Sequence, residues 1–210
     1  MDRSTLSGVL HLVRHGRVEN PRGVIYGRLP GYLLSETGRR QADAAAEHLA
    51  TRPVAVIRTS PLERARETAA AIAARVELEP VVDHRLIESE TTLEGAVVTL
   101  GRFLASPRSW WRLRNPWRPS WGESFAEVRT RMMEAVGEAL AEAAGGEAVL
   151  VSHQTPLLVV RVTLGGRRVP PWLSRLPCRT GSVTTLRLEQ GRTIAATYFD
   201  PPSDGVHRRW

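Results

Sequence analysis

Short apolar runs that end at turn residues recur along the chain. The three clearest cover residues 9–13, 54–57 and 148–151. Apolar runs of this length, bounded by turn residues, are typical of buried strands. Nearer the C-terminus, residues 182–188 and 193–199 have the composition of a hairpin. The pattern therefore predicts three buried strands and a terminal hairpin.

Signals that start helices follow these runs. Ser35 is expected to cap one helix, and Thr155-Pro156 is expected to start another. Two further serines are each followed by a glutamate three residues later, which is the pattern of a capping box. The two pairs are Ser60 with Glu63 and Ser124 with Glu127. The first three helices are expected over about 35–50, 60–75 and 124–144. The alternation of strands and helices predicts a three-layer α/β/α sandwich with a mostly parallel central sheet.

Residues suited to phosphate chemistry follow each of the three apolar runs. Arg14 and His15 come directly after the first, and His153 comes shortly after the third. Arg64 lies in the first turn of the helix expected after the second run. Parallel strands end at one edge of the sheet, where open α/β folds bind ligands. Because guanidinium groups bind phosphate oxygens and imidazole can act as a nucleophile, we expect a phosphate-handling site there.

Five segments resemble parts of one known family and occur along the chain in that family's order. Arg14-His15-Gly16, residues 60–65 and Val151-Ser152-His153 resemble the three signatures of the histidine phosphatase superfamily, also called phosphoglycerate-mutase-like. Residues 26–31 and 34–42 resemble its substrate loop and first helix. The resemblance spans roughly residues 8–165. It implies a phosphoglycerate-mutase-like fold and a phosphohistidine intermediate on His15, with Arg14, Arg64 and His153 in the catalytic site.

The resemblance also implies a carboxyl group that exchanges protons with the leaving group and with water. Leu86-Ile87-Glu88 matches the family's pattern for this acid, so Glu88 is the expected residue. The chain is one residue shorter than the common spacing between Glu88 and Glu94-Gly95, so Glu90 remains a rival. The catalytic set is therefore expected to include Glu88, with Glu90 as its alternative.

Three further residues are expected to bind substrate. Asn20 matches the family's phosphate-binding asparagine, although it stands one position early. Gln154 follows His153 directly, and Arg28 lies in the segment that resembles the substrate loop. The predicted substrate-binding set comprises Arg14, Asn20, Arg28, Arg64, His153 and Gln154.

Composition is that of a single globular domain over residues 1–210. Hydrophobic residues make up 42% of the chain and charged residues 24%. No apolar stretch approaches the roughly 20 residues that span a bilayer, and the N-terminus lacks the pattern of a signal peptide. Cys178 is the single cysteine, which excludes an internal disulfide and is typical of a reducing compartment. We therefore expect a cytoplasmic protein without a membrane partner.

All 29 basic residues are arginine, and the net charge is +7. The absence of lysine excludes Schiff-base chemistry and the lysine-dependent phosphate loops of NTPases and kinases. A basic surface favours anionic substrates and can also attract nucleic acid without sequence specificity. It can equally be a plain solvated surface.

A segment rich in Trp, Arg and Pro covers about residues 105–123. It could be a lid that shapes the substrate pocket, a stacking platform for single-stranded nucleic acid, or a cap packed on the protein's own core. Its end, Trp121-Gly122-Glu123-Ser124, resembles the family's stretch before its long helix, which favours a cap. Gly122 and Glu123 are then expected near the pocket mouth.

The resulting hypothesis is a hydrolase of small-molecule phosphomonoesters that acts through a phosphohistidine. No cofactor, no metal and no specific nucleic-acid partner are expected, and the protein is expected to be a monomer or a homodimer. The first alternative is a phosphomutase of the phosphoglycerate mutase type. This is less favoured because the chain is shorter than glycolytic mutases of the family. The second is a non-catalytic phosphate- or nucleic-acid-binding protein, which would have no need of the histidine nucleophile.

Overall fold

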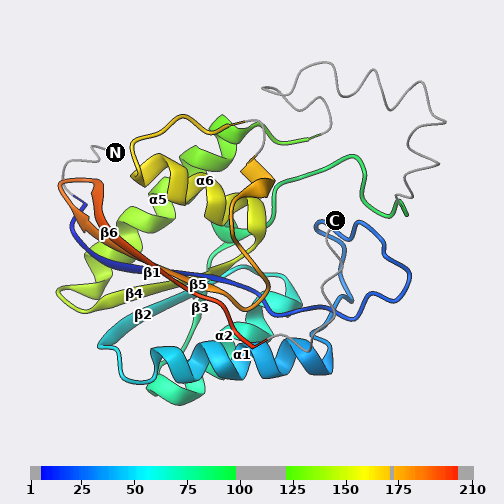
Figure 1. The fold of residues 1–210 in the computed structure, drawn as a ribbon, viewed down its shortest axis with the longest axis horizontal. Coiled ribbons are helices and arrows are strands. Elements are labelled where there is room, and N and C mark those ends of the chain that lie inside the picture. Colours follow the sequence, from blue (N-terminus) through cyan, green and yellow to red (C-terminus); the bar gives the residue numbers. More distant parts are fainter. Residues whose placement is uncertain (1–5, 98–121, 171–172, 203–210) are drawn as a thin grey trace.

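A six-stranded sheet forms the middle layer of the computed structural model, which describes residues 6–97, 122–170 and 173–202 (Figure 1). The strand order is β3-β2-β4-β1-β5-β6. The first four strands in this order run parallel to one another, β5 runs antiparallel to β1, and β6 runs antiparallel to β5. The strands are β1 Gly8–Arg14, β2 Val54–Thr59, β3 Val81–Val82, β4 Glu147–Ser152, β5 Val183–Glu189 and β6 Arg192–Phe199. The predicted mostly parallel sheet and the terminal hairpin are confirmed.

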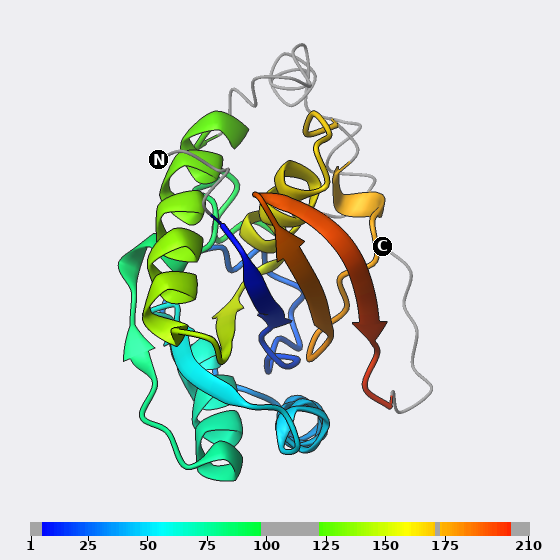
Figure 2. The ribbon, with the colours of Figure 1, turned by 90° about the vertical axis from the view of Figure 1, so that its left-hand side faces the viewer.

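Helices cover both faces of this sheet (Figures 1 and 2). α1 (Glu36–Leu49) and α2 (Glu63–Val76) pack together on one face. α5 (Phe125–Ala143) and α6 (Gln154–Leu164) cover the other face. Two short 3-10 helices, η2 and η3, cover His84–Leu86 and Leu173–Arg175. The three-layer α/β/α sandwich predicted from the sequence is confirmed.

Alternate residues of the central strands point to opposite helical layers. On β1, Leu10 and Leu12 join the cluster formed with α5 and α6, whereas Val13 joins the cluster formed with α1 and α2. On β4, Leu150 and Val151 divide in the same way. Because every second side chain of a strand faces the same side, both faces of these strands must be apolar. Apolar packing on both faces holds the central strands in place, and with them the positions of their ends.

Two helix starts differ from the sequence predictions. α2 begins at Glu63, with Leu62 as its N-cap and no side-chain cap, so the predicted capping box at Ser60 is wrong. The Ser60 hydroxyl instead lies 2.7 Å from His153 Nε2. α6 begins at Gln154 with His153 as its N-cap, earlier than the start predicted at Thr155-Pro156. Proline is compatible with the first turn, where its missing N–H would have no helical partner.

The predicted caps of two other helices are confirmed. Ser35 accepts a hydrogen bond from Gly38 N at the start of α1. Ser124 and Glu127 form the predicted capping box of α5. Within the described residues, no helix is long and apolar enough to cross a membrane. The Trp-rich segment predicted as a cap lies outside the described residues up to position 121, so its role and the single-domain assignment remain predictions.

The start of α1 packs so closely against the turn that follows β1 that only glycine fits at the contact. A Cβ atom on Gly38 would lie 1.9 Å from the carbonyl oxygen of Arg17, and one on Gly16 would lie 2.3 Å from that of Gly38. Both neighbours are backbone atoms, which cannot rotate away as a side chain can. The turn after β1 can therefore keep its position only while both residues are glycine.

We expect Gly38→Ala to lower the free energy of unfolding by about 1–3 kcal/mol, the usual cost of forcing extra atoms into a packed region. The measurement is chemical unfolding followed by circular dichroism. Gly165→Ala is the matched control, because its Cβ would meet its nearest neighbour, Arg161 O, at 3.3 Å. Equal stability of Gly38→Ala and the wild type would contradict this packing.

Candidate active site

The ends of β1, β2 and β4 lie side by side, and the residues that follow them converge. His15 N donates to Ser152 O at 3.0 Å, and Ser60 N donates to Val151 O at 3.0 Å. The ring centroids of His15 and His153 are 5.0 Å apart. The predicted meeting of these strand ends at one edge of the sheet is therefore observed.

His15 is held in a defined orientation and protonation state. The residue is 2% exposed, and its Nδ1 lies 2.7 Å from the carbonyl oxygen of Gly16. A carbonyl oxygen can only accept, so the proton of the neutral ring is on Nδ1 and the lone pair is on Nε2. Burial, together with the positive charges of Arg14 and Arg64, holds the pKa of His15 well below its usual value. The ring is therefore neutral near pH 7, and Nε2 is free to act as a nucleophile.

Arg64 projects from the first turn of α2 and is fully buried. Its Nη2 donates to Gly27 O at 2.6 Å, and its guanidinium lies 4.8 Å from the ring centroid of Tyr26. Its Nε and Nη1 have no hydrogen-bond partner among the described residues. A buried guanidinium with two unused donors is costly unless an anion binds there.

Two more side chains have unused donors at the same edge of the sheet. Arg14 Nη1 donates to Cys178 O at 2.6 Å, whereas its Nε has no partner within the described part of the chain. His153 is also fully buried, and its Nδ1 has no partner there either. Together with Arg64, these residues present four unpaired buried nitrogen atoms. Buried polar atoms are nearly always paired, so such a group is suited to an oxyanion ligand.

The tautomer of His153 follows from Ser60. Ser60 Oγ accepts from Leu62 N at 3.4 Å, and His153 Nε2, at 2.7 Å, is the one acceptor for its hydroxyl proton among the described residues, so the hydroxyl donates to Nε2. Burial, with the nearby positive charges of Arg64 and Arg14, holds the pKa of His153 well below its usual value. The neutral ring then has its proton on Nδ1, the atom without a partner. His153 is thus prepared to donate a hydrogen bond into the site.

Glu88 lies in the electrostatic field of Arg14 and Arg64. Burial raises the pKa of the Glu88 carboxyl, although the backbone N–H of Ser89 and the charges of Arg14 and Arg64 oppose this rise. Its Oε1 accepts from Ser89 N at 2.8 Å. The Glu90 side chain is 64% exposed. A carboxyl group with a raised pKa, close enough to Arg14 and Arg64 to interact with the charges of both, is suited to proton transfer at that site, which favours Glu88 over its rival.

The three remaining predicted substrate contacts have protein partners. Both polar atoms of the Asn20 amide bond to the backbone of Val24, at 2.9 and 3.0 Å. Gln154 Nε2 lies 3.5 Å from Ser174 O. The guanidinium of Arg28 donates to Glu88 O at 2.8 Å and to Glu123 Oε2 at 3.0 Å. Substrate binding by these three residues remains a prediction.

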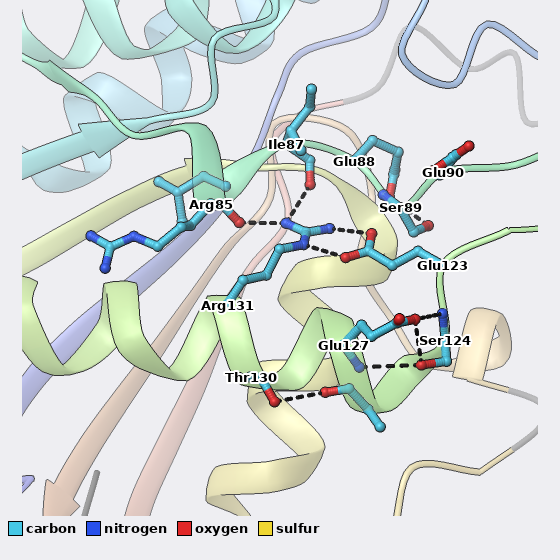
Figure 3. A network of polar contacts seen from close by, with 12 residues as sticks. Arg85, Ile87, Glu88, Ser89, Glu90, Glu123, Ser124, Glu127, Thr130 and Arg131 are labelled. Atoms are coloured by element: carbon cyan, nitrogen blue, oxygen red, sulfur yellow. Dashed lines mark hydrogen bonds and ion pairs between the residues drawn. The ribbon is translucent and has the colours of Figure 1, made fainter.

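Sequence reasoning missed Thr68 and Arg131. Thr68 Oγ1 accepts from Gly16 N at 3.1 Å and donates to Arg64 O at 2.8 Å, so it connects the turn after β1 to α2. Its position four residues after Arg64, on the same face of the helix, was the available signal. Arg131 lies in the middle of α5 and pairs with Glu123 (Figure 3). Nothing in its neighbourhood along the sequence distinguishes it from a surface arginine.

Within residues 6–97, 122–170 and 173–202, no group of three or more His, Cys, Asp or Glu side chains is placed so that it could hold a metal ion. The positive charge in the site comes instead from Arg14 and Arg64, which are chemically suited to an anionic ligand.

The chain belongs to the histidine phosphatase superfamily, branch 1, whose family model matches residues 10–201. It is 46% identical over 193 residues to Uncharacterized protein Rv0525 of Mycobacterium tuberculosis, covering 91% of this chain and 96% of the relative. It is 35% identical over 180 residues to glucosyl-3-phosphoglycerate phosphatase of Mycolicibacterium vanbaalenii, covering 78% and 76%. The native structure of mycobacterial glucosyl-3-phosphoglycerate phosphatase aligns with a TM-score of 0.74 at 28% identity, over 92% of this chain and 97% of that one. The predicted family and its fold are confirmed.

We expect Ser60→Ala to lower the free energy of unfolding by about 1–3 kcal/mol, because His153 Nε2 would be buried without a partner. Nitrogen-15 NMR should show the proton of His153 on Nδ1 in the wild type and distributed over both nitrogens in the variant. Ser174→Ala, at an exposed position in η3, is the control. An unchanged tautomer and unchanged stability in Ser60→Ala would contradict the assignment.

Proposed function

We propose that this protein is a phosphomonoester phosphatase that works through a phosphohistidine on His15. One observation supports this most strongly. The unprotonated Nε2 of a neutral, buried His15 lies at the same edge of the sheet as four unpaired nitrogen donors on Arg14, Arg64 and His153. Nucleophile and oxyanion donors in one buried site are the arrangement that phosphoryl transfer requires.

In the first step, the oxygens of the phosphoryl group bind the free donors of the two arginines and Nδ1 of His153. The lone pair on His15 Nε2 forms a bond to phosphorus, and the bond from phosphorus to the ester oxygen breaks. Glu88 gives its proton to that oxygen, which leaves as an alcohol. The phosphorylated ring becomes cationic, and the hydrogen bond from Nδ1 to Gly16 O becomes charge-assisted.

In the second step, the Glu88 carboxylate takes a proton from water, and the water oxygen attacks phosphorus. The bond from phosphorus to Nε2 breaks, and its electron pair returns to the ring. Inorganic phosphate is released, His15 is neutral again and Glu88 is protonated again. One carboxyl group thus acts as acid and then as base, which requires the pKa of Glu88 to lie above the usual carboxyl range, the direction in which burial shifts it.

Hydrolysis of the phosphohistidine is preferred to the mutase reaction, in which the phosphoryl group returns to the substrate, because the named relatives at 35% and 28% identity are phosphatases. They act, by name, on glucosyl-3-phosphoglycerate, a phosphate monoester of a small glycosylated acid. We accordingly propose a small phosphomonoester as the substrate class. Metal-independent activity in a cytoplasmic setting is part of the same proposal.

The function is tested with a panel of small phosphomonoesters, including phosphorylated sugar acids, by measuring phosphate release. We expect release by the wild type, also in excess EDTA, and none by His15→Ala. His84→Ala, which removes an exposed imidazole, is the control and should retain activity. Full activity in His15→Ala would contradict the mechanism. Activity lost with EDTA and restored by one divalent metal would contradict the role given to the arginines.

The assignment of the acid makes a separate prediction. Glu88→Gln should slow turnover of an alkyl phosphate by roughly 10²–10⁴-fold, the usual contribution of proton transfer. Formation of the phosphoenzyme from an activated aryl phosphate should slow much less, because its leaving group hardly needs a proton. Glu90→Gln is the matched control. If Glu90→Gln shows this pattern and Glu88→Gln does not, the assignment belongs to Glu90.

A further inference from the structure

The backbone that leads from η2 to Glu88 is held by a guanidinium from α5. Arg131 Nη1 donates to the carbonyl oxygen of Arg85 and, at 2.8 Å, to that of Ile87 (Figure 3). Residues 88–90 belong to neither a helix nor a strand, so no regular ladder of hydrogen bonds fixes them. Together with Ser152 Oγ, which donates to Leu86 O at 2.6 Å, this side chain holds the chain just before Glu88.

Glu123 fixes Arg131 from its other side. The carboxylate of Glu123 accepts from Arg131 Nε at 2.7 Å and from Nη2 at 2.9 Å (Figure 3). The two side chains are only 14% and 16% exposed. Two parallel hydrogen bonds in a site largely shielded from water hold a guanidinium far more firmly than an exposed ion pair does. Arg131 is thus held in the orientation that reaches both carbonyl groups.

Arg28 extends the same cluster to the loop that contains Gly27. Its Nη2 donates to Glu123 Oε2 at 3.0 Å, and its Nε donates to the carbonyl oxygen of Glu88 at 2.8 Å. In the same loop, Gly27 O accepts from Arg64 of the phosphate site. The carboxylate of Glu123 therefore joins two guanidinium groups, which together bind the backbone before and at Glu88.

We propose that Arg131, Glu123 and Arg28 are positioning residues, which hold the backbone of Glu88 so that its carboxyl reaches the leaving oxygen. The inference rests on the proposed function, because it assumes that Glu88 is the acid and base. It also gives Arg28 a role through Glu88 in place of direct substrate contact. Lysine cannot replace Arg131, since one ammonium group cannot bond to both carbonyls and to both carboxylate oxygens in a planar arrangement.

A merely structural role would have a different kinetic result. If the cluster only stabilises the fold, its variants should lower stability and slow all substrates equally. If the cluster positions Glu88, the loss of rate in its variants must depend on how much the leaving group needs a proton. Misplacement of a reacting group by about 1 Å can cost about 100-fold in rate. The comparison of leaving groups therefore separates positioning from stability.

The test compares Arg131→Lys and Glu123→Gln with wild type on an alkyl phosphate and on 4-nitrophenyl phosphate. We expect kcat for the alkyl phosphate to fall by about 10–100-fold with little change in KM, and phosphorylation by the aryl phosphate to slow much less. Arg129→Lys and Glu134→Gln, both exposed on α5, are the matched controls. Unfolding midpoints are measured for every variant, and Glu123→Gln provides the test if Arg131→Lys does not fold.

Double variants with Glu88→Gln complete the test. If a residue acts through Glu88, its substitution should slow turnover little further once the Glu88 carboxyl has been removed. The double variant should therefore have nearly the same rate as Glu88→Gln alone. Equal slowing of both substrates, or losses that multiply in the double variant, would overturn the inference and leave the proposed function intact. A Glu88→Gln enzyme without selective loss on the alkyl phosphate would overturn the role of Glu88, and with it this inference.

Discussion

The site depends on one constraint, which is that two arginine side chains stay at the edge of the sheet with donors that the protein does not use. Each buried polar group without a partner costs about 1–3 kcal/mol, and a charged group costs more. Arg64 is fully buried, yet two of its nitrogens have no partner among the described residues. Apolar contacts on both faces of the sheet offset this cost, because they fix the strands from whose ends Arg14 and His15 emerge. The unpaired donors are suited to the oxygens of an anion, which would complete the missing hydrogen bonds.

The same surroundings affect the proposed nucleophile, His15, and the proposed acid, Glu88. Burial disfavours charge, so it lowers the pKa of His15 and raises that of Glu88. The arginines reinforce the shift at His15 and oppose it at Glu88. Both residues are consequently biased toward their neutral forms, which are the forms that the proposed mechanism requires for attack on phosphorus and for protonation of the leaving oxygen.

Local sequence patterns predicted the parts of the fold that depend on local rules. The strand ends at His15 and His153 follow from apolar runs and turn residues, and the caps at Ser35 and Ser124 follow from capping preference. Ser60 has the same local pattern, but its hydroxyl bonds to His153, 93 residues away along the chain. A tertiary contact of this kind overrides a capping preference of about 1 kcal/mol.

The cluster around Arg131 could not be predicted for a related reason. Its partners, Glu123, Arg85 and Ile87, come from different segments, and no periodic pattern relates them. Family resemblance identified Glu88, whereas the structure gave the contacts that favour it over Glu90. A catalytic carboxyl group in a loop thus has to be located in the structure, whereas functional residues at a strand end can be predicted from the sequence.

The most direct test of the mechanism is to detect the covalent intermediate. Enzyme mixed rapidly with a substrate labelled at phosphorus is quenched in alkali, in which phosphohistidine is stable, and the labelled peptide is identified by mass spectrometry. The account predicts a label on His15 that is lost in acid and is absent from His15→Ala. A wild-type enzyme that turns over rapidly with no label on His15, or with the label on another residue, would contradict it.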